Sequence, residues 1–112
     1  MVKSLTFFSL SRYYLVIFLT KEFESEGDIK SETLGLSKLG GICQLETSCN
    51  VNQNTGLATA VTIAHEMAHN LNADHAGDEC GLETIMTSEL KYYVKEVTWS
   101  DCTSDSILNF LE

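Results

Sequence analysis

The sequence predicts one domain of the α+β (α/β) class, in which a small sheet packs on an amphipathic helix and a second helix follows at the C-terminus. The run from Tyr13 to Leu19 is rich in aromatic and β-branched residues, as buried strands are. Apolar residues recur every three or four positions between residues 57 and 71, which is the spacing of an amphipathic helix. The apolar residues between Ile107 and Leu111 predict the second helix.

The first twelve residues have no clear role. Their apolar run from Leu5 to Leu10 is weak, and Arg12 interrupts it, so no signal peptide is evident. The strand Tyr13 to Leu19 is far shorter than the roughly 20 apolar residues of a membrane span. At 112 residues the chain is long enough for one domain and too short for two. We therefore expect one domain without a membrane span.

Two connecting segments follow the strand. Lys21 to Thr33 is highly charged and lacks apolar periodicity, which predicts a solvated loop. Leu34 to Cys43 is either a glycine-rich connector or a segment whose glycines let another backbone approach closely. Cys43 to Val51 could continue this segment as a short strand. The asparagines at positions 50, 52 and 54 are then expected in the turns that follow.

The amphipathic helix is expected to begin at a cap formed by Asn54 or Thr55. Beyond the helix, Ala76 to Thr84 is predicted to be a loop that leads to Ile85 and Met86. Ser104 is the predicted cap of the C-terminal helix. The expected apolar positions of the amphipathic helix are Leu57, Ala58, Val61, Ala64, Ala68 and Leu71. A separate apolar patch comprises Tyr92, Tyr93, Val94, Val97 and Trp99.

Three histidines are spaced to bind one metal ion. On a helix, His65 and His69 lie roughly 40° apart around the axis and about 6 Å apart along it, so both rings can reach one ion. His75 follows six residues later, where a continuous helix would place it on the opposite face. The chain must therefore turn, and Asn72 is suited to the left-handed conformation that ends a helix. The alternative is a polar helix face with two surface histidines and a third in a loop.

Glu66 is placed to act as a general base. It follows the first histidine, where its carboxylate can accept a hydrogen bond from a metal-bound water without being a ligand. Three neutral imidazoles would leave a fourth zinc position for that water, which is the open arrangement of a catalytic site.

Charge and cysteine content limit the partners and the compartment. The 16 acidic residues outnumber the 7 Lys and Arg, and the net charge of -9 disfavours nucleic acid and anionic membranes as partners. The four cysteines could bind zinc in a cytosolic protein, but none forms a C-x-x-C pair, so disulfides are favoured. Three pairings are possible, and disulfides imply an oxidising compartment. The cysteines are Cys43, Cys49, Cys80 and Cys102.

The stretch from His65 to His75 resembles the metzincin signature H-E-x-x-H-x-x-G-x-x-H of zinc peptidases, with Asn72 in the place of glycine. The resemblance covers residues 13–112 and favours the reprolysin (adamalysin/ADAM, M12B) branch. It is strongest to the catalytic domain of ADAMTS-type enzymes, which also carry Asn at this position. Ala76 departs from the pattern, because Asp usually follows the third histidine. Further landmarks are Tyr14–Thr20, Thr33–Leu36, Gly40–Cys43, Thr55–Leu57, Ile85–Met86, Trp99–Cys102 and Phe110–Leu111.

The resemblance implies the C-terminal half of a metzincin-like zincin fold, with a sheet remnant, an active-site helix, a Met-turn and a C-terminal helix. Met86 would form the floor beneath the histidines. Cys80 would pair with Cys102, while Cys43 and Cys49 would have no family partner within the chain and would either bond to each other or remain free. Because the earlier strands of that fold are absent, Tyr13 to Leu19 is expected to have an exposed edge.

The function implied is that of a secreted or extracellular zinc-dependent metalloendopeptidase that cleaves extracellular proteins or peptides. One zinc ion per chain would be held by His65, His69 and His75, and Glu66 would deprotonate the zinc-bound water. An extended substrate is expected to pair along Leu39, Gly40, Gly41 and Ile42. Calcium binding is undecided. The alternative is a truncated, catalytically silent zinc-binding fragment or decoy, and a structural zinc module would give Glu66 no purpose.

Overall fold

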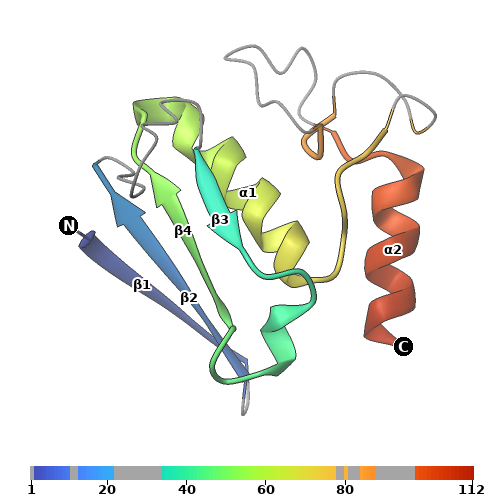
Figure 1. The fold of residues 1–112 in the computed structure, drawn as a ribbon, viewed down its shortest axis with the longest axis horizontal. Coiled ribbons are helices and arrows are strands. Elements are labelled where there is room, and N and C mark those ends of the chain that lie inside the picture. The colour runs from blue at the N-terminus through green and yellow to red at the C-terminus, as the bar shows by residue number, and fades with distance from the viewer. Residues whose placement is uncertain (1, 11–12, 22–33, 78–79, 81–83, 88–97) are drawn as a thin grey trace, which may run out of the picture.

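The computed structural model describes residues 2–10, 13–21, 34–77, 80, 84–87 and 98–112, and it has the expected α+β architecture. A four-stranded sheet has the order β1-β2-β4-β3. Helix α1 packs on β3 and β4, and Figure 1 shows α2 on the far side of α1 from the sheet. The elements are β1 (Val2–Leu10), β2 (Tyr13–Thr20), β3 (Gly35–Ser37), β4 (Cys49–Gln53), α1 (Thr59–Asn70) and α2 (Asp101–Leu111), with short 3-10 helices at Gly41–Cys43 and Gly56–Ala58.

The predicted buried strand is β2, and it lies inside the sheet. Its Leu15 and Ile17 side chains are buried. β2 pairs in parallel with β4, from Val16 opposite Cys49 to Thr20 opposite Gln53. β3 then pairs antiparallel with β4 and forms an edge.

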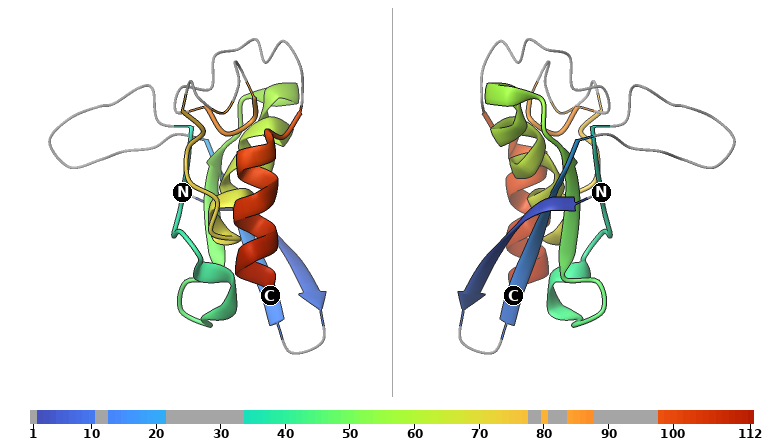
Figure 2. Two further views of the ribbon diagram at one scale, coloured as in Figure 1. Left: turned by 90° about the vertical axis from the view of Figure 1, so that its right-hand side faces the viewer. Right: turned by 90° about the vertical axis from the view of Figure 1, so that its left-hand side faces the viewer.

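The prediction that β2 has an exposed edge is wrong, because β1 pairs with that edge. β1 pairs antiparallel with β2 from Leu10 opposite Tyr13 to Val2 opposite Thr20, with one irregularity between Val2 and Ser4. Figure 2 shows this pair in blue. Only two residues separate the strands, so the chain folds back as a hairpin and pairs the backbone groups that β2 would otherwise present.

The segment predicted to bind an extended substrate is not a strand. β3 ends at Ser37, and the chain then turns through Gly40, whose φ of 68° is left-handed, into the 3-10 helix Gly41–Cys43. The backbone N–H of Gly40 donates to the His69 carbonyl and that of Gly41 to the Lys38 carbonyl. These bonds curl Leu39 to Ile42 back towards α1, so the extended segment lies earlier in the chain than predicted.

Helix α1 begins later than predicted. The Asn54 side chain accepts a hydrogen bond from the Gly56 backbone, which belongs to the 3-10 turn that precedes α1. α1 itself starts at Thr59 without a side-chain cap. Leu57, predicted as an apolar position of the helix face, therefore lies on this turn and is 100% exposed.

The asparagines of β4 are core residues rather than turn residues. Asn50, Asn52 and Asn70 are buried, and their amides form a hydrogen-bonded chain. Asn52 Nδ2 donates to Asn50 Oδ1 at 2.7 Å, and Asn50 Nδ2 donates to Asn70 Oδ1 at 2.9 Å. Asn70 Nδ2 in turn donates to the Cys49 carbonyl at 3.0 Å. This network joins the C-terminal end of α1 to β4.

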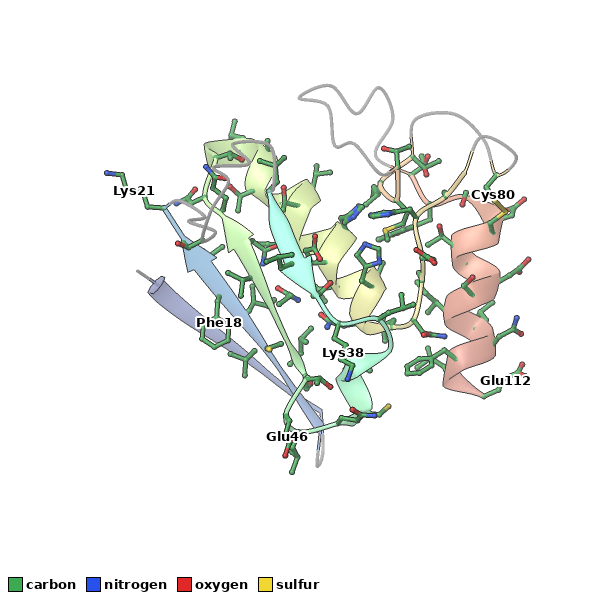
Figure 3. The ribbon with its side chains drawn as sticks, viewed as in Figure 1. Phe18, Lys21, Lys38, Glu46, Cys80 and Glu112 are labelled. Carbon is green, nitrogen blue, oxygen red and sulfur yellow. A yellow bond between two sulfur atoms is a disulfide. The ribbon has the colours of Figure 1, made fainter. Side chains whose placement is uncertain are left out.

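The N-cap of helix α2 lies four residues before the predicted one. Ser100, rather than Ser104, is the N-cap, and its hydroxyl accepts a hydrogen bond from the Thr103 backbone N–H. Ile107 of α2 packs against the apolar cluster that contains Ala68 and Met86. Cys80 and Cys102 form the disulfide that the resemblance implied, and Cys80, labelled in Figure 3, lies beside the N-terminal end of α2.

Some predictions concern residues beyond those that the structure describes. The charged loop lies outside them from residue 22 to residue 33, as do most of the apolar patch around Tyr92 and part of the loop between Ala76 and Thr84. Neither helix within the described residues is long and apolar enough to cross a bilayer.

Candidate metal centre

The three imidazole rings converge on one point. The Nε2 atoms of His65 and His69 are 3.1 Å apart, and each lies 3.2 Å from Nε2 of His75. His65 and His69 come from successive turns of α1, as their four-residue spacing requires. His75 comes from the segment that follows the helix, so a reversal of the chain completes the triangle.

Asn72 makes that reversal. Its φ is 71°, the left-handed conformation that Asn adopts more readily than most residues. The N–H groups of Leu71 and Ala73 bond to the Ala68 carbonyl, and the N–H of Asn72 bonds to the His69 carbonyl. The last turn of α1 is thereby closed, and the chain turns back towards the histidines, as the sequence predicted.

Backbone carbonyls orient two of the rings. His65 Nδ1 lies 2.6 Å from the Ile85 carbonyl, and His69 Nδ1 lies 2.6 Å from the Ala73 carbonyl. Because a carbonyl only accepts hydrogen bonds, each Nδ1 must carry the proton, and a neutral ring then has a lone pair on Nε2. Carbonyl partners of this kind commonly set the tautomer of metal-binding histidines.

Burial favours the neutral form of two of the three imidazoles, His65 and His75. It lowers the pKa of His65 to about 4, although the bond to the Ile85 carbonyl opposes this, and the nearby His69 and His75 lower it further. Burial also lowers the pKa of His75, with His69 acting in the same direction and Asp74 in the opposite one. Neutral imidazole is the form that binds metal.

The donor set fits zinc. Zn–N distances of about 2.0–2.1 Å with tetrahedral angles place ligand nitrogens about 3.3 Å apart, close to the separations found here. The unprotonated Nε2 atoms of His65 and His69 cannot hydrogen-bond to each other, so a cation between them would satisfy both lone pairs. His65, His69 and His75 are the group of described residues whose ligand atoms could hold a metal.

Glu66 is buried against β3. It is 5% exposed, and its Oε2 accepts a hydrogen bond of 2.5 Å from the Ser37 hydroxyl. Burial raises the pKa of Glu66, while the bond from Ser37 and the charge of His69 lower it. A Cβ atom at Gly35 would lie 2.6 Å from both Cγ and Oε1 of Glu66, so only glycine leaves room for this side chain. Sequence reasoning missed Ser37, although its two-residue spacing from Gly35 places both on one face of a strand.

Met86 lies in the apolar cluster next to the histidines. It is fully buried with Ala68, Ala73 and Ile85. The Met86 carbonyl accepts a hydrogen bond from the Ala76 N–H, and the adjacent Ile85 carbonyl is the partner of His65. Ile85 and Met86 therefore link Ala76, the residue after His75, to the ring of His65.

The α+β fold and the histidine triad fit part of a metzincin-like catalytic domain. Residues 15–112 match the model of the reprolysin (M12B) family of zinc metalloproteases, and the chain belongs to this family.

Similar proteins include members of the group named a disintegrin and metalloproteinase with thrombospondin motifs. The chain is 42% identical to number 12 of this group from Mus musculus over an alignment of 87 residues. That alignment covers 72% of this chain and 5% of the relative. It is 41% identical to number 10 of Homo sapiens, over 71% of this chain and 8% of the relative. A match of 32% identity to gon-1 of Caenorhabditis elegans extends over 93% of this chain and 5% of the relative. The chain thus spans less than a tenth of the length of these relatives.

Proposed function

We propose that this chain forms the catalytic zinc centre of a metalloendopeptidase that cleaves extracellular proteins, with Glu66 as the general base. The convergence of three Nε2 atoms beside a buried carboxylate carries the proposal. Family membership supports it.

The side chains would divide the work of peptide hydrolysis. His65, His69 and His75 would hold the ion through Nε2, and bound zinc would supply a Lewis acid that acidifies a water and polarises the scissile carbonyl. Glu66 would accept a proton from the attacking water and then deliver it to the nitrogen of the leaving amine. The raised pKa of Glu66 suits a group that must first take up and then release a proton.

An extended peptide would pair with the free edge of β3. Among the described strands β3 pairs with β4 alone, and the Leu36 side chain is 58% exposed. Addition of a strand to such an edge gives affinity through main-chain hydrogen bonds. The predicted contacts at Leu39, Gly40, Gly41 and Ile42 would then lie just beyond the paired residues. The N–H groups of Gly40 and Gly41 are already bonded, so β3 supplies the pairing.

The disulfide supports an oxidising compartment. Cys80 and Cys102 are bonded, and such bonds persist mainly in secreted and extracellular proteins. We place the substrates there for the same reason.

Zinc content and peptide cleavage test the proposal together. The purified 112-residue chain should bind one zinc ion and cleave members of a peptide library, and His69→Ala should lose the metal. Glu66→Gln should retain zinc and lose about 10²-fold or more in kcat, because a positioned general base contributes 10²–10⁴-fold. Zinc binding without cleavage that depends on Glu66 would instead support the silent zinc-binding fragment or decoy.

A further inference from the structure

The buried carboxylate of Glu66 is held by the edge strand as well as by its own helix. Gly35 and Ser37 lie on the same face of β3, and the Leu36 side chain between them points away and is exposed. That shared face meets Glu66, because the Ser37 hydroxyl bonds to Oε2 and a Cβ at Gly35 would collide with the side chain. One residue thus provides the hydrogen bond and the other provides the space.

The position of β3 is itself fixed relative to α1. Ser37 pairs with Asn50 in the sheet, and Gly35 pairs with Asn52. Asn50 donates to the side chain of Asn70, which lies four residues after Glu66 on the same face of α1. The contacts therefore form a closed ring, from Glu66 to Ser37, across the sheet to Asn50, and back to α1 at Asn70.

We propose that Ser37 is a positioning residue for Glu66, and that its hydroxyl holds the carboxylate against the strand that would bind the peptide. The contact joins the proton acceptor to β3, so substrate strand and base keep one relative position. Its catalytic consequence rests on the proposed function. Displacing a catalytic group by about 1 Å can lower the rate about 10²-fold, so a contact that fixes the position of Glu66 should affect kcat.

Unfolding of the zinc-free 112-residue chain in urea tests the contact without any catalysis. In a double-mutant cycle, Ser37→Ala should lower the urea midpoint of the wild-type chain and change it much less when Glu66→Ala is already present. Gly35→Ala should behave in the same way, because its added Cβ collides with Glu66. Equal shifts in both backgrounds would overturn the proposed contact. The matched control is Ser104→Ala, an exposed serine on α2 whose effect should be small in both backgrounds.

Kinetics of the zinc-loaded chain test the positioning role. Ser37→Ala should lower kcat about tenfold with KM unchanged, which is part of the contribution of a positioned base. Ser37→Thr keeps the hydroxyl and should recover most of the loss, while Ser104→Ala should match the wild type. A rise in KM at unchanged kcat would overturn the positioning role and make Ser37 a substrate-binding residue.

The two measurements separate the two proposals. If the wild-type chain cleaves no peptide, the proposed function fails, whereas the urea cycle still decides whether Ser37 holds Glu66. All three histidines of the chain belong to the metal centre, so their side-chain NMR signals report on it alone. These signals should be the same in zinc-loaded Ser37→Ala and wild type, and a changed pattern would assign the kinetic loss to altered ligands and overturn the positioning role.

Discussion

His65 and Glu66 are neighbours in the sequence, and burial moves both towards their neutral forms. The two side chains are 4% and 5% exposed. Burial penalises the charged form of either group, so it lowers the pKa of His65 to about 4 and raises the pKa of Glu66. One physical effect thus favours an unprotonated imidazole, the form that binds metal, and beside it a carboxyl group with increased proton affinity.

The stability of the zinc-free chain should fall in acid because of His65. Its pKa is about 4 in the folded chain and 6.5 as the ordinary value, so the unfolded chain binds more protons between these limits. The contribution of His65 to the free energy of unfolding should be complete above pH 6.5. This contribution should decrease as the pH falls towards 4 and stay constant below that pH. Urea unfolding at pH 7.5, 5.5 and 4 would measure this.

His65→Gln is the control for that pH dependence. Glu66 opposes the loss of stability in acid, because its raised pKa makes the folded chain bind more protons. His75, whose pKa is lowered, reinforces the loss. The variant keeps both neighbours and removes only the His65 contribution, so its stability should decline less steeply. An equal decline in the variant and the wild type would contradict the assignment to His65.

At the scale of the element, a four-residue spacing on α1 aligns two pairs of side chains with different partners. His65 and His69 present their rings to the candidate metal centre, while Glu66 and Asn70, also four residues apart, bond to β3 and β4. The helix is therefore held on the sheet by polar contacts beside its ligand-bearing face. An unpaired buried amide is costly, so the bond between Asn50 and Asn70 favours this attachment of the helix to the sheet.

Asn70→Ala should weaken the attachment of α1 to the sheet. The substitution leaves the Asn50 amide and the Cys49 carbonyl without their partner, which costs about 1–3 kcal/mol for a buried polar group. The free energy of unfolding should fall by that amount in urea titrations. Asn109→Ala, an exposed residue of α2, is the matched control and should have little effect. Equal losses in the two variants would show that the buried network contributes nothing.

The end of α1 depends on a left-handed residue. Asn72 has a φ of 71°, so Asn72→Gly should be tolerated, whereas Asn72→Val should lower the free energy of unfolding by about 1–2 kcal/mol. Zinc affinity should decrease with Val and stay near wild type with Gly, because the turn places His75. Calorimetric zinc titration of the two variants would measure it, and equal affinities would argue against this role of the turn.

At the scale of the whole molecule, one disulfide links the region after the histidines to α2. It joins residues separated by 22 positions, Cys80 and Cys102. Replacing both by serine should cost about 3 kcal/mol of unfolding free energy, from the loop entropy returned to the unfolded chain. Urea unfolding measures the loss. Cys43→Ser, at an exposed cysteine without a disulfide, is the control and should leave the midpoint unchanged.

Local spacing in the sequence predicted much of this protein. The α+β class, the strand β2, the helix bearing His65 and His69, and the turn at Asn72 all follow from patterns within a few residues, because helix and turn geometry is local. The convergence of three imidazoles was predictable for the same reason. Family resemblance added the disulfide, which no spacing rule could select among three pairings.

Only the tertiary structure decided which distant segments meet. The pairing of β1 with β2, the burial of Asn50 and Asn52, and the bond between Ser37 and Glu66 depend on contacts across the sheet or between sheet and helix. The same polar residue types are common in turns, so residue type alone placed Asn50 and Asn52 wrongly in turns. The sequence by itself determined which atoms can bind a metal, whereas packing determined what holds them in place, because hydrogen bonds between segments depend on how the chain folds back on itself.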